Sequence, residues 1–176
     1  RLRKRLQQYL TSLKKNALVI DVGGGTGLNR ALFLGDIQYL CLDNDPVKLS
    51  GMLQKQVNGY PLLGDAGKMP IPTASVDMVI CTAVTHHLLD DVLSLFFQES
   101  MRVLKSDGQL VVLDAVWMPN RILSRILWKY DRGSFPRSAQ VLHDTLSQYG
   151  QEVHWEEFAI LHRYIIGIFK KNEVIS

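Results

Sequence analysis

A glycine-rich turn preceded by an acid is the segment of this 176-residue chain whose spacing most clearly suggests chemistry. After Asp21, glycines occupy every second position at Gly23, Gly25 and Gly27. Glycine has no Cβ and readily adopts positive φ, so such a turn lets the backbone approach a ligand closely. A helical pattern resumes at Leu28, and the free N–H groups of a helix start would face that ligand. The turn therefore predicts a cofactor site.

The spacing of the glycines separates the cofactor classes that use such a turn. A dinucleotide-binding turn has its third glycine three positions beyond the second, where this chain has Leu28. A phosphate-binding loop requires Gly-Lys-Ser or Gly-Lys-Thr, which the sequence lacks. A carboxylate at Asp21 would repel a pyrophosphate but suits an ammonium or a sulfonium-bearing amino acid.

Further candidate residues follow the later predicted strands. Asp43 lies 22 positions beyond Asp21, where an acid can accept both ribose hydroxyls. Asp65 and Ala66 follow the third predicted strand, and Thr82 follows the fourth. In an open α/β sheet ligands bind beyond the carboxyl ends of the strands, so these residues are expected to meet at one site.

Each of these residues also has a purely structural interpretation. Asp21 could simply end a strand, although four glycines within residues 23–27 exceed what a plain turn needs. Asp43 could be only a turn residue before Pro46, and Asp65 only the first residue of a loop. Their shared position after successive strands favours the functional interpretation.

Strand and helix patterns alternate along most of the chain. Strands are expected at residues 17–22, 37–42, 60–63, 76–82, 110–114, 152–160 and 163–169, and helices at residues 1–14, from 46 to about 58, 90–104 and 119–133. Such alternation implies an α/β fold with a doubly wound, mostly parallel sheet and helices on both faces. The last two strands are too close in sequence for a crossover helix, so they predict an antiparallel hairpin. The last strand is apolar on both faces and should be interior.

Motifs in order along residues 17–114 resemble class I S-adenosylmethionine-dependent methyltransferases. The matching pieces are Asp21 to Gly27, Leu42-Asp43-Asn44 for the ribose, Gly64-Asp65-Ala66 for the adenine, Thr85-His86-His87-Leu88, and Arg102 to Gly108. The last two pieces are similar to the small-molecule branch, which includes quinone-biosynthesis methyltransferases. Ser106 and Asp107 stand where that family usually has Pro-Gly. The resemblance implies a Rossmann-like fold, S-adenosylmethionine as cofactor, S-adenosylhomocysteine as product, and a cofactor site formed by Asp21, Gly23, Gly25, Gly27, Asp43, Asn44, Asp65, Ala66 and Thr82.

Candidate catalytic residues follow the fourth and fifth predicted strands. If the methyl acceptor is a hydroxyl, His86 or His87 could take its proton, and Asp114 is a second candidate. A base is optional, because the cofactor already carries the leaving group. A histidine at a helix start is often structural, and Asp114 could instead cap the following segment.

The substrate side is expected after the fifth strand. Residues 119–133 have the pattern of a basic amphipathic helix, which could cover the sheet or dock on a membrane, the former being the commoner use. Arg132 and Arg137 lie in or beside it and are predicted to hold an anionic substrate under a lid.

Composition limits the remaining possibilities. The chain is 47% hydrophobic and 21% charged, with no apolar run long enough to span a membrane and no specific nucleic-acid motif. Residues 1–15 carry six basic side chains and no acid, within a net charge of +3. Cys41 and Cys81 lie in apolar runs and read as buried thiols of a cytoplasmic protein. We predict no metal site. The chain begins at Arg1 rather than Met, which leaves room for a preceding segment.

Together these features predict one methyltransferase domain over residues 1–176. Residues 1–14 would form its basic helix, residues 17–114 its cofactor half, and residues 115–176 its substrate-side helices and hairpin. The predicted function is methylation of a small metabolite, anionic or lipid-like in character. Methylation of RNA or protein, favoured only by the basic N-terminus, and a non-catalytic cofactor-binding module stay open as alternatives.

Overall fold

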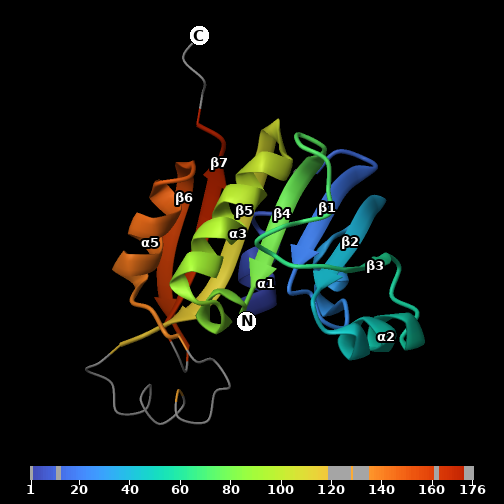
Figure 1. Ribbon diagram of the computed structural model, residues 1–176, viewed down its shortest axis with the longest axis horizontal. Helices are drawn as coiled ribbons and strands as arrows, with labels where there is room; N and C mark the ends of the chain where they lie inside the picture. Colours follow the sequence, from blue (N-terminus) through green and yellow to red (C-terminus); the bar gives the residue numbers. More distant parts are fainter. Residues whose placement is uncertain (1, 11–12, 119–127, 129–134, 161–162, 173–176) are drawn as a thin grey trace.

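The computed structural model describes residues 2–10, 13–118, 128, 135–160 and 163–172 (Figure 1). Its strands are β1 (Ala17–Val22), β2 (Ile37–Asp43), β3 (Tyr60–Leu63), β4 (Val76–Thr82), β5 (Leu104–Val116), β6 (Gln151–Ala159) and β7 (Arg163–Lys170). Its helices are α1 (Leu2–Gln7), α2 (Pro46–Gln54), α3 (Asp90–Val103) and α5 (Ala139–Ser147), with short 3₁₀ helices η1 (Leu28–Leu32) and η2 (Thr85–His87).

The strands of the described residues form one seven-stranded sheet in the order β3-β2-β1-β4-β5-β7-β6. Neighbours from β3 to β5 are parallel, whereas β7 is antiparallel to both β5 and β6. This topology confirms the predicted Rossmann-like fold and its C-terminal hairpin. The strand predicted to be interior, β7, lies between β5 and β6 and is buried along most of its length.

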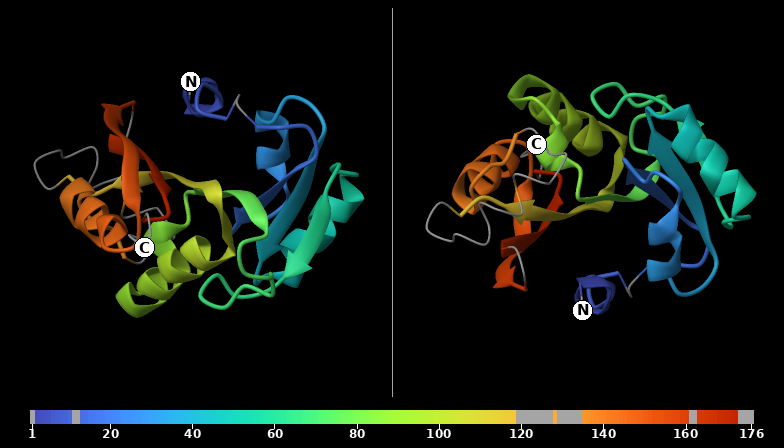
Figure 2. Two further views of the ribbon diagram at one scale, coloured as in Figure 1. Left: turned by 90° about the horizontal axis from the view of Figure 1, so that it is seen from above. Right: turned by 90° about the horizontal axis from the view of Figure 1, so that it is seen from below.

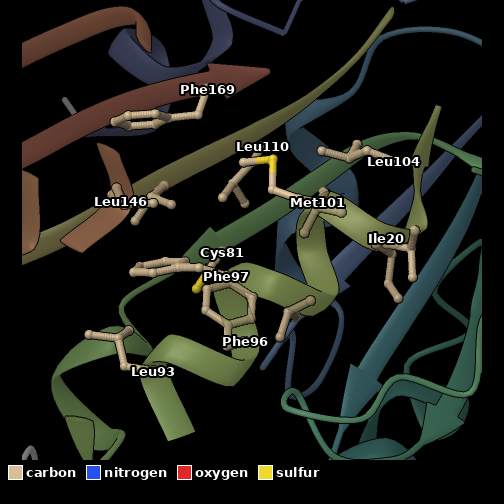
Figure 3. Packing of buried hydrophobic residues seen from close by; sticks show 14 of the residues in the cluster. Ile20, Cys81, Leu93, Phe96, Phe97, Met101, Leu104, Leu110, Leu146 and Phe169 are labelled. Carbon is tan, nitrogen blue, oxygen red and sulfur yellow. The ribbon is translucent and has the colours of Figure 1, made fainter. Parts of the chain in front are cut away.

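Apolar side chains cover both faces of the sheet. On one face, Phe97 of α3 and Leu146 of α5 pack in the same cluster as Ile20 and Phe169 of the strands (Figure 3). On the other face, a separate cluster combines α1, η1 and α2 with the opposite side of the strands. Figure 2 shows α1 and α3 on opposite sides of the sheet. Helices on both faces are therefore confirmed.

The start of α2 follows from its first residues. Asp45 stands at the N-cap, where its carboxylate accepts from the backbone N–H of Val47 (2.8 Å) and Lys48 (3.4 Å). Pro46 occupies the first helical position, which needs no N–H donor. This cap fixes the loop after β2 and therefore the direction in which Asp43 leaves the sheet.

Three elements differ from the sequence expectation. The helix predicted over residues 1–14 ends at Gln7, because the next N–H groups bond three residues back and tighten the chain into a turn that buries Leu10. The helix expected at Leu28 is only a five-residue 3₁₀ helix. The predicted turn at residues 106–108 falls inside β5, between the pairs Val76–Leu104 and Met78–Gln109, as a bulge.

Other expectations fall partly outside the described residues. The basic amphipathic helix predicted over residues 119–133 is one of these, and within that range the structure describes only Trp128, which is buried. Of the helices in the described part of the chain, none has the length and apolarity that a membrane span requires. Cys41 and Cys81 are both buried free thiols, and burial raises the pKa of Cys41 to about 12.

Candidate functional site

The glycine turn after β1 adopts the backbone that its sequence predicts. Gly23, Gly25 and Gly27 have φ values of 68°, 58° and 73°, which side chains with a Cβ rarely adopt. The N–H groups of Gly23 and Gly24 donate to the carbonyl of Leu42 at 2.8 and 3.2 Å, which ties the turn to β2. A Cβ on Gly23 would lie 2.4 Å from Cγ2 of Val84. The glycines therefore leave open the space between the turn and the loop after β4.

A cavity of about 330 Å³ opens beside this turn, at the carboxyl ends of β1, β2 and β4. Five of the predicted cofactor residues line it: Gly23, Asp43, Asn44, Asp65 and Ala66. Lys48, Val84, His87 and Leu88 complete much of the remaining wall. Gly25 and Gly27 support the turn from outside this lining, and Asp21 and Thr82 lie elsewhere in the site.

Asp43 forms the base of this cavity and is only 3% exposed. One carboxylate oxygen accepts from the N–H of Gly25 at 3.0 Å, and the other accepts from the N–H of Asp45 at 2.9 Å. The ammonium of Lys48 lies 3.8 Å away. Asp43 thus joins the glycine turn to the start of α2 while its carboxylate borders the cavity.

Asp65 and Ala66 shape the cavity wall that follows β3. The carboxylate of Asp65 accepts from the N–H of Gly67 at 2.6 Å, which closes a local turn and orients the Asp65 side chain. Ala66 is small and partly buried, and it packs against the apolar cluster beneath α3. This wall therefore combines one acceptor group with a flat apolar surface.

Asp21 lies beneath the glycine turn instead of lining the cavity. It is fully buried, and it accepts hydrogen bonds from the hydroxyl of Tyr39 and from Nδ2 of Asn29, the latter at 3.1 and 3.2 Å to its two oxygens. Nδ2 of Asn29 also lies 2.7 Å from Oγ1 of Thr82, to which it donates. A Cβ on Gly24 would lie 2.5 Å from the Asp21 carboxylate. Asp21 thus supports the turn from below.

Burial raises the pKa of Asp21 to about 7, although its hydrogen bonds to Tyr39 and Asn29 oppose the shift. The unfolded chain releases this proton near pH 4, whereas the folded protein holds it until about pH 7. The contribution of Asp21 to stability is therefore complete below about pH 4 and is lost as the pH rises toward 7.

An Asp21→Asn substitution should remove this loss. We expect the free energy of unfolding of the variant, relative to that of the native sequence, to rise by about 1 kcal/mol per pH unit between pH 5 and pH 7. Urea unfolding at several pH values measures this difference, in which other titrating groups cancel. A difference that stays constant across that window would show that Asp21 is ionised throughout.

A second cavity of about 280 Å³ lies at the carboxyl ends of β4, β5 and β7. It brings together the three predicted catalytic residues and Thr82, and its described lining consists of Leu2, Thr82, Ala83, His86, His87, Leu113, Asp114, Ala115 and Tyr164. We call this space the acceptor-side cavity and the cavity beside the glycine turn the cofactor-side cavity.

His86 and Asp114 form a buried pair in the wall of the acceptor-side cavity. Nδ1 of His86 lies 2.5 Å from Oδ1 of Asp114, and the two side chains are 5% and 0% exposed. Asp114 also accepts from the backbone N–H of Thr85 (2.7 Å) and of Ala115 (2.7 Å), and from the Thr85 hydroxyl. These donors fit an ionised carboxylate, which accepts from Nδ1–H and so makes Nε2 the basic nitrogen of a neutral ring.

Ala83 and His87 line both cavities and form the wall between them. Ala83 has φ of 56°, in the left-handed region, and its N–H donates to the carbonyl of Leu113 at 2.9 Å. Such strain at a non-glycine residue persists only where the surrounding structure holds it, and it is commonest at functional sites. The ring of the exposed His87 lies 4.2 Å from that of His86, measured between centroids.

The two predicted substrate residues have different outcomes. Arg132 lies outside the described residues. Arg137 is described and lines neither cavity, because its guanidinium is engaged with the loop after β4. Among the described residues no group of three or more His, Cys, Asp or Glu side chains is placed to hold a metal ion.

Sequence reasoning missed several residues of the site. Asn29 and Tyr39 hold Asp21, and Val84 faces the glycine turn. A buried tyrosine in the middle of β2 was a possible signal, because its hydroxyl requires a hydrogen-bond partner. Nothing in the spacing of Asn29 or Val84 distinguishes them from ordinary loop residues.

Comparisons with known proteins agree with this geometry. A family model described as a methyltransferase domain matches residues 20–112. A Haloferax volcanii candidate methyltransferase complex with the Trm112 activator includes a similar chain, with TM-score 0.83, 15% identity, and coverage of 99% of this chain and 90% of that one. A TehB-like S-adenosylmethionine-dependent methyltransferase from Corynebacterium glutamicum gives TM-score 0.70, 17% identity, and coverage of 97% and 87%. The enzyme LepI, solved with S-adenosylhomocysteine, gives TM-score 0.72, 15% identity, and coverage of 95% and 46%.

At these identities the structural likeness shows a shared fold. Among curated proteins, no sequence matches the chain. The fold alone does not fix a reaction, since one fold hosts many chemistries, so the substrate must be argued from the two cavities.

Proposed function

Since this chain belongs to the methyltransferase domain family and is an S-adenosylmethionine-dependent methyltransferase, we propose that it methylates a hydroxyl group of a small metabolite. The observation that carries this proposal is the pair of adjoining cavities, which share Ala83 and His87. Methyl transfer requires the acceptor atom and the methyl donor to lie next to each other and in line. Two cavities that share a wall meet this requirement.

The cofactor-side cavity fits S-adenosylmethionine by its shape and its donor set. The space that a Cβ on Gly23 would fill stays open for a ligand, and Asp43 offers carboxylate oxygens suited to a ribose. Asn44, Asp65 and Ala66 would surround the adenine, while the buried charge of Asp21 below the turn would attract the ammonium of the methionine part. When bound, S-adenosylmethionine supplies an electrophilic methyl group together with its own leaving group.

Ligand-induced stabilisation tests the cofactor side directly. S-adenosylhomocysteine at about 100 times its dissociation constant should raise the free energy of unfolding by about 2.7 kcal/mol, because it binds the folded state only. NAD and ATP at the same concentration should leave the melting temperature unchanged, because the turn lacks the glycine and lysine positions that hold their phosphates. Thermal unfolding by circular dichroism measures all three. Stabilisation by NAD without stabilisation by S-adenosylhomocysteine would overturn the assignment.

On the acceptor side, His86 is placed to receive the hydroxyl proton. Asp114 holds Nδ1–H, so Nε2 of His86 is the nitrogen that accepts the proton as the acceptor oxygen becomes nucleophilic. Asp114 then stabilises the imidazolium that forms, as the acid of a catalytic triad does. His87, at the wall between the cavities, would orient the acceptor oxygen toward the methyl donor.

The lining of the acceptor-side cavity supports a small, uncharged acceptor group. Its described residues include no lysine or arginine, and Leu2, Leu113 and Tyr164 give it apolar surface. An anionic or lipid-like remainder of the substrate would extend past Leu2 toward the exposed cations Arg3 and Lys4 of α1. A carboxylate or phosphate acceptor group would not be neutralised within this cavity.

Methyl labelling distinguishes this function from methylation of a macromolecule. The protein is incubated with S-adenosylmethionine carrying a labelled methyl group and with a host extract divided into small-metabolite, RNA and protein fractions. We expect label in the small-metabolite fraction, bound through an ether or ester oxygen. Label only in RNA or protein would favour the second enzyme class, and no transfer despite tight cofactor binding would favour a binding module.

A further inference from the structure

Arg137 grips the loop that carries the two histidines. Its Nη1 donates to the carbonyl of Thr85 at 2.8 Å, and its Nη2 donates to the carbonyl of Leu88 at 2.7 Å. These two carbonyls stand on either side of His86 and His87 in the chain. One planar guanidinium therefore spans the whole of η2 from beginning to end.

The remaining contacts of Arg137 secure the guanidinium itself. Asp90, at the start of α3, accepts from Nε at 2.8 Å and from Nη2 at 2.5 Å, and the carbonyl of Phe135 accepts from Nη1 at 3.3 Å. The Arg137 side chain is 9% exposed, whereas that of Asp90 is 92% exposed. Charge-assisted bonds to an arginine are among the stronger hydrogen bonds of proteins, and burial of the fork limits competition from water.

Backbone hydrogen bonds place the same segment between the loops after β4 and β5. The N–H of Phe135 donates to the carbonyl of His86 at 3.0 Å, and the N–H of Trp117 donates to the carbonyl of Arg137 at 2.7 Å. The chain around Arg137 is thus tied to the loop that bears His86 and to the end of the strand that bears Asp114.

We propose that Arg137 is a positioning residue, whose guanidinium clamps the carbonyls on both sides of His86 and His87 and so holds these rings at the acceptor-side cavity. The importance of this clamp for turnover rests on the proposed function, whereas its effect on the rings does not. Arg137 itself lines neither cavity, so it acts through the loop.

Arg102 offers a matched control. Its guanidinium also donates to two carbonyls, of Ile71 (2.9 Å) and Met69 (3.1 Å), and pairs with a carboxylate, that of Glu99 (2.6 Å). It lines neither cavity. Arg102→Ala therefore removes a comparable set of bonds at a distance from the two histidines in the chain.

The experiment compares Arg137→Ala, Arg137→Lys and Arg102→Ala in the full chain. Histidine ring signals are followed by NMR in protein labelled with ¹⁵N at histidine, without acceptor and with S-adenosylhomocysteine as the probe. We expect both alanine variants to lower the melting temperature and to keep the native affinity for S-adenosylhomocysteine within about twofold. Only Arg137→Ala should shift and broaden the signals of His86 and His87, with Arg137→Lys intermediate because lysine reaches fewer acceptors.

Two results would overturn the clamp. One is a folded Arg137→Ala protein whose histidine signals match the native ones, and the other is an equal disturbance of these signals in Arg102→Ala. If Arg137→Ala does not fold, Arg137→Lys and Asp90→Asn, which weakens only the exposed ion pair, carry the same comparison. Once an acceptor is known, Arg137→Ala should lower kcat about 10- to 100-fold with little change in KM. Failure to find any acceptor would count against the proposed function, while the NMR result still decides the clamp.

Discussion

Replacing His86 by alanine is expected to lower kcat for methyl transfer about 100- to 10,000-fold, the usual contribution of a general base. His86 is the buried histidine of the acceptor-side cavity, and Asp114 fixes its proton on the nitrogen that faces the carboxylate. Without the ring, the acceptor hydroxyl would lose its proton only to water. The measurement is steady-state turnover on the acceptor found by methyl labelling, together with its pH profile, whose acid limb should disappear in the variant.

The chain supplies a control for this experiment. His143 of α5 also pairs with an acid, Glu152 of β6, at 2.7 Å, but it lies outside both cavities. Glu152 raises the pKa of His143, so the pair is charged over part of the same pH range. His143→Ala should therefore leave kcat and its pH profile unchanged. Native turnover in a folded His86→Ala protein would show that the acceptor needs no base or that His87 serves instead.

The sheet could be predicted from the sequence because its strands are unusually well marked. β1 and β4 are apolar on both faces, as strands between two helical layers must be, and β2 ends in the helix cap at Asp45. The terminal hairpin was also predictable, since a short turn cannot contain a crossover helix. These signals are local, and each is carried by a few neighbouring residues.

The helices were predicted less well because their ends depend on tertiary contacts. α1 stops at Gln7, and Tyr9 then leaves the helical path to reach Glu156 of β6 at 3.2 Å. α5 was not predicted, although Ser138 caps it by accepting from the N–H of Val141 and Leu142 and Leu146 form its buried side. A helix with only two buried positions has a weak apolar pattern, so its cap was the more useful signal.

The site shows a similar division between local and distant information. That Asp43 and Asp65 would meet was predictable, because the carboxyl ends of parallel strands share one edge. That Asp21 would lie below the turn was not, because the direction of its side chain depends on Tyr39 and Asn29. Arg137 looked like a substrate ligand for the same reason: the carbonyls that it binds belong to residues about 50 positions earlier.

Replacing Asp43 by alanine is expected to weaken binding of S-adenosylhomocysteine by about 1.5–3 kcal/mol, the contribution of hydrogen bonds to a charged group, or roughly 10- to 150-fold in dissociation constant. The loss has two sources, since the carboxylate borders the cavity and also holds the N–H of Gly25 in the glycine turn. Isothermal calorimetry measures the affinity, and thermal unfolding shows whether the variant is folded.

Two further variants separate these sources. Asp43→Asn keeps the shape of the side chain but removes its charge, so it should retain more of the fold and still lose affinity. Asp45→Ala removes the cap of α2 two residues later and should cost about 1 kcal/mol of stability without a comparable loss of affinity. If folded Asp43→Ala and Asp43→Asn proteins bind S-adenosylhomocysteine as the native protein does, Asp43 is only the tie between the glycine turn and α2, and the ribose must be held by other residues of the cofactor-side cavity.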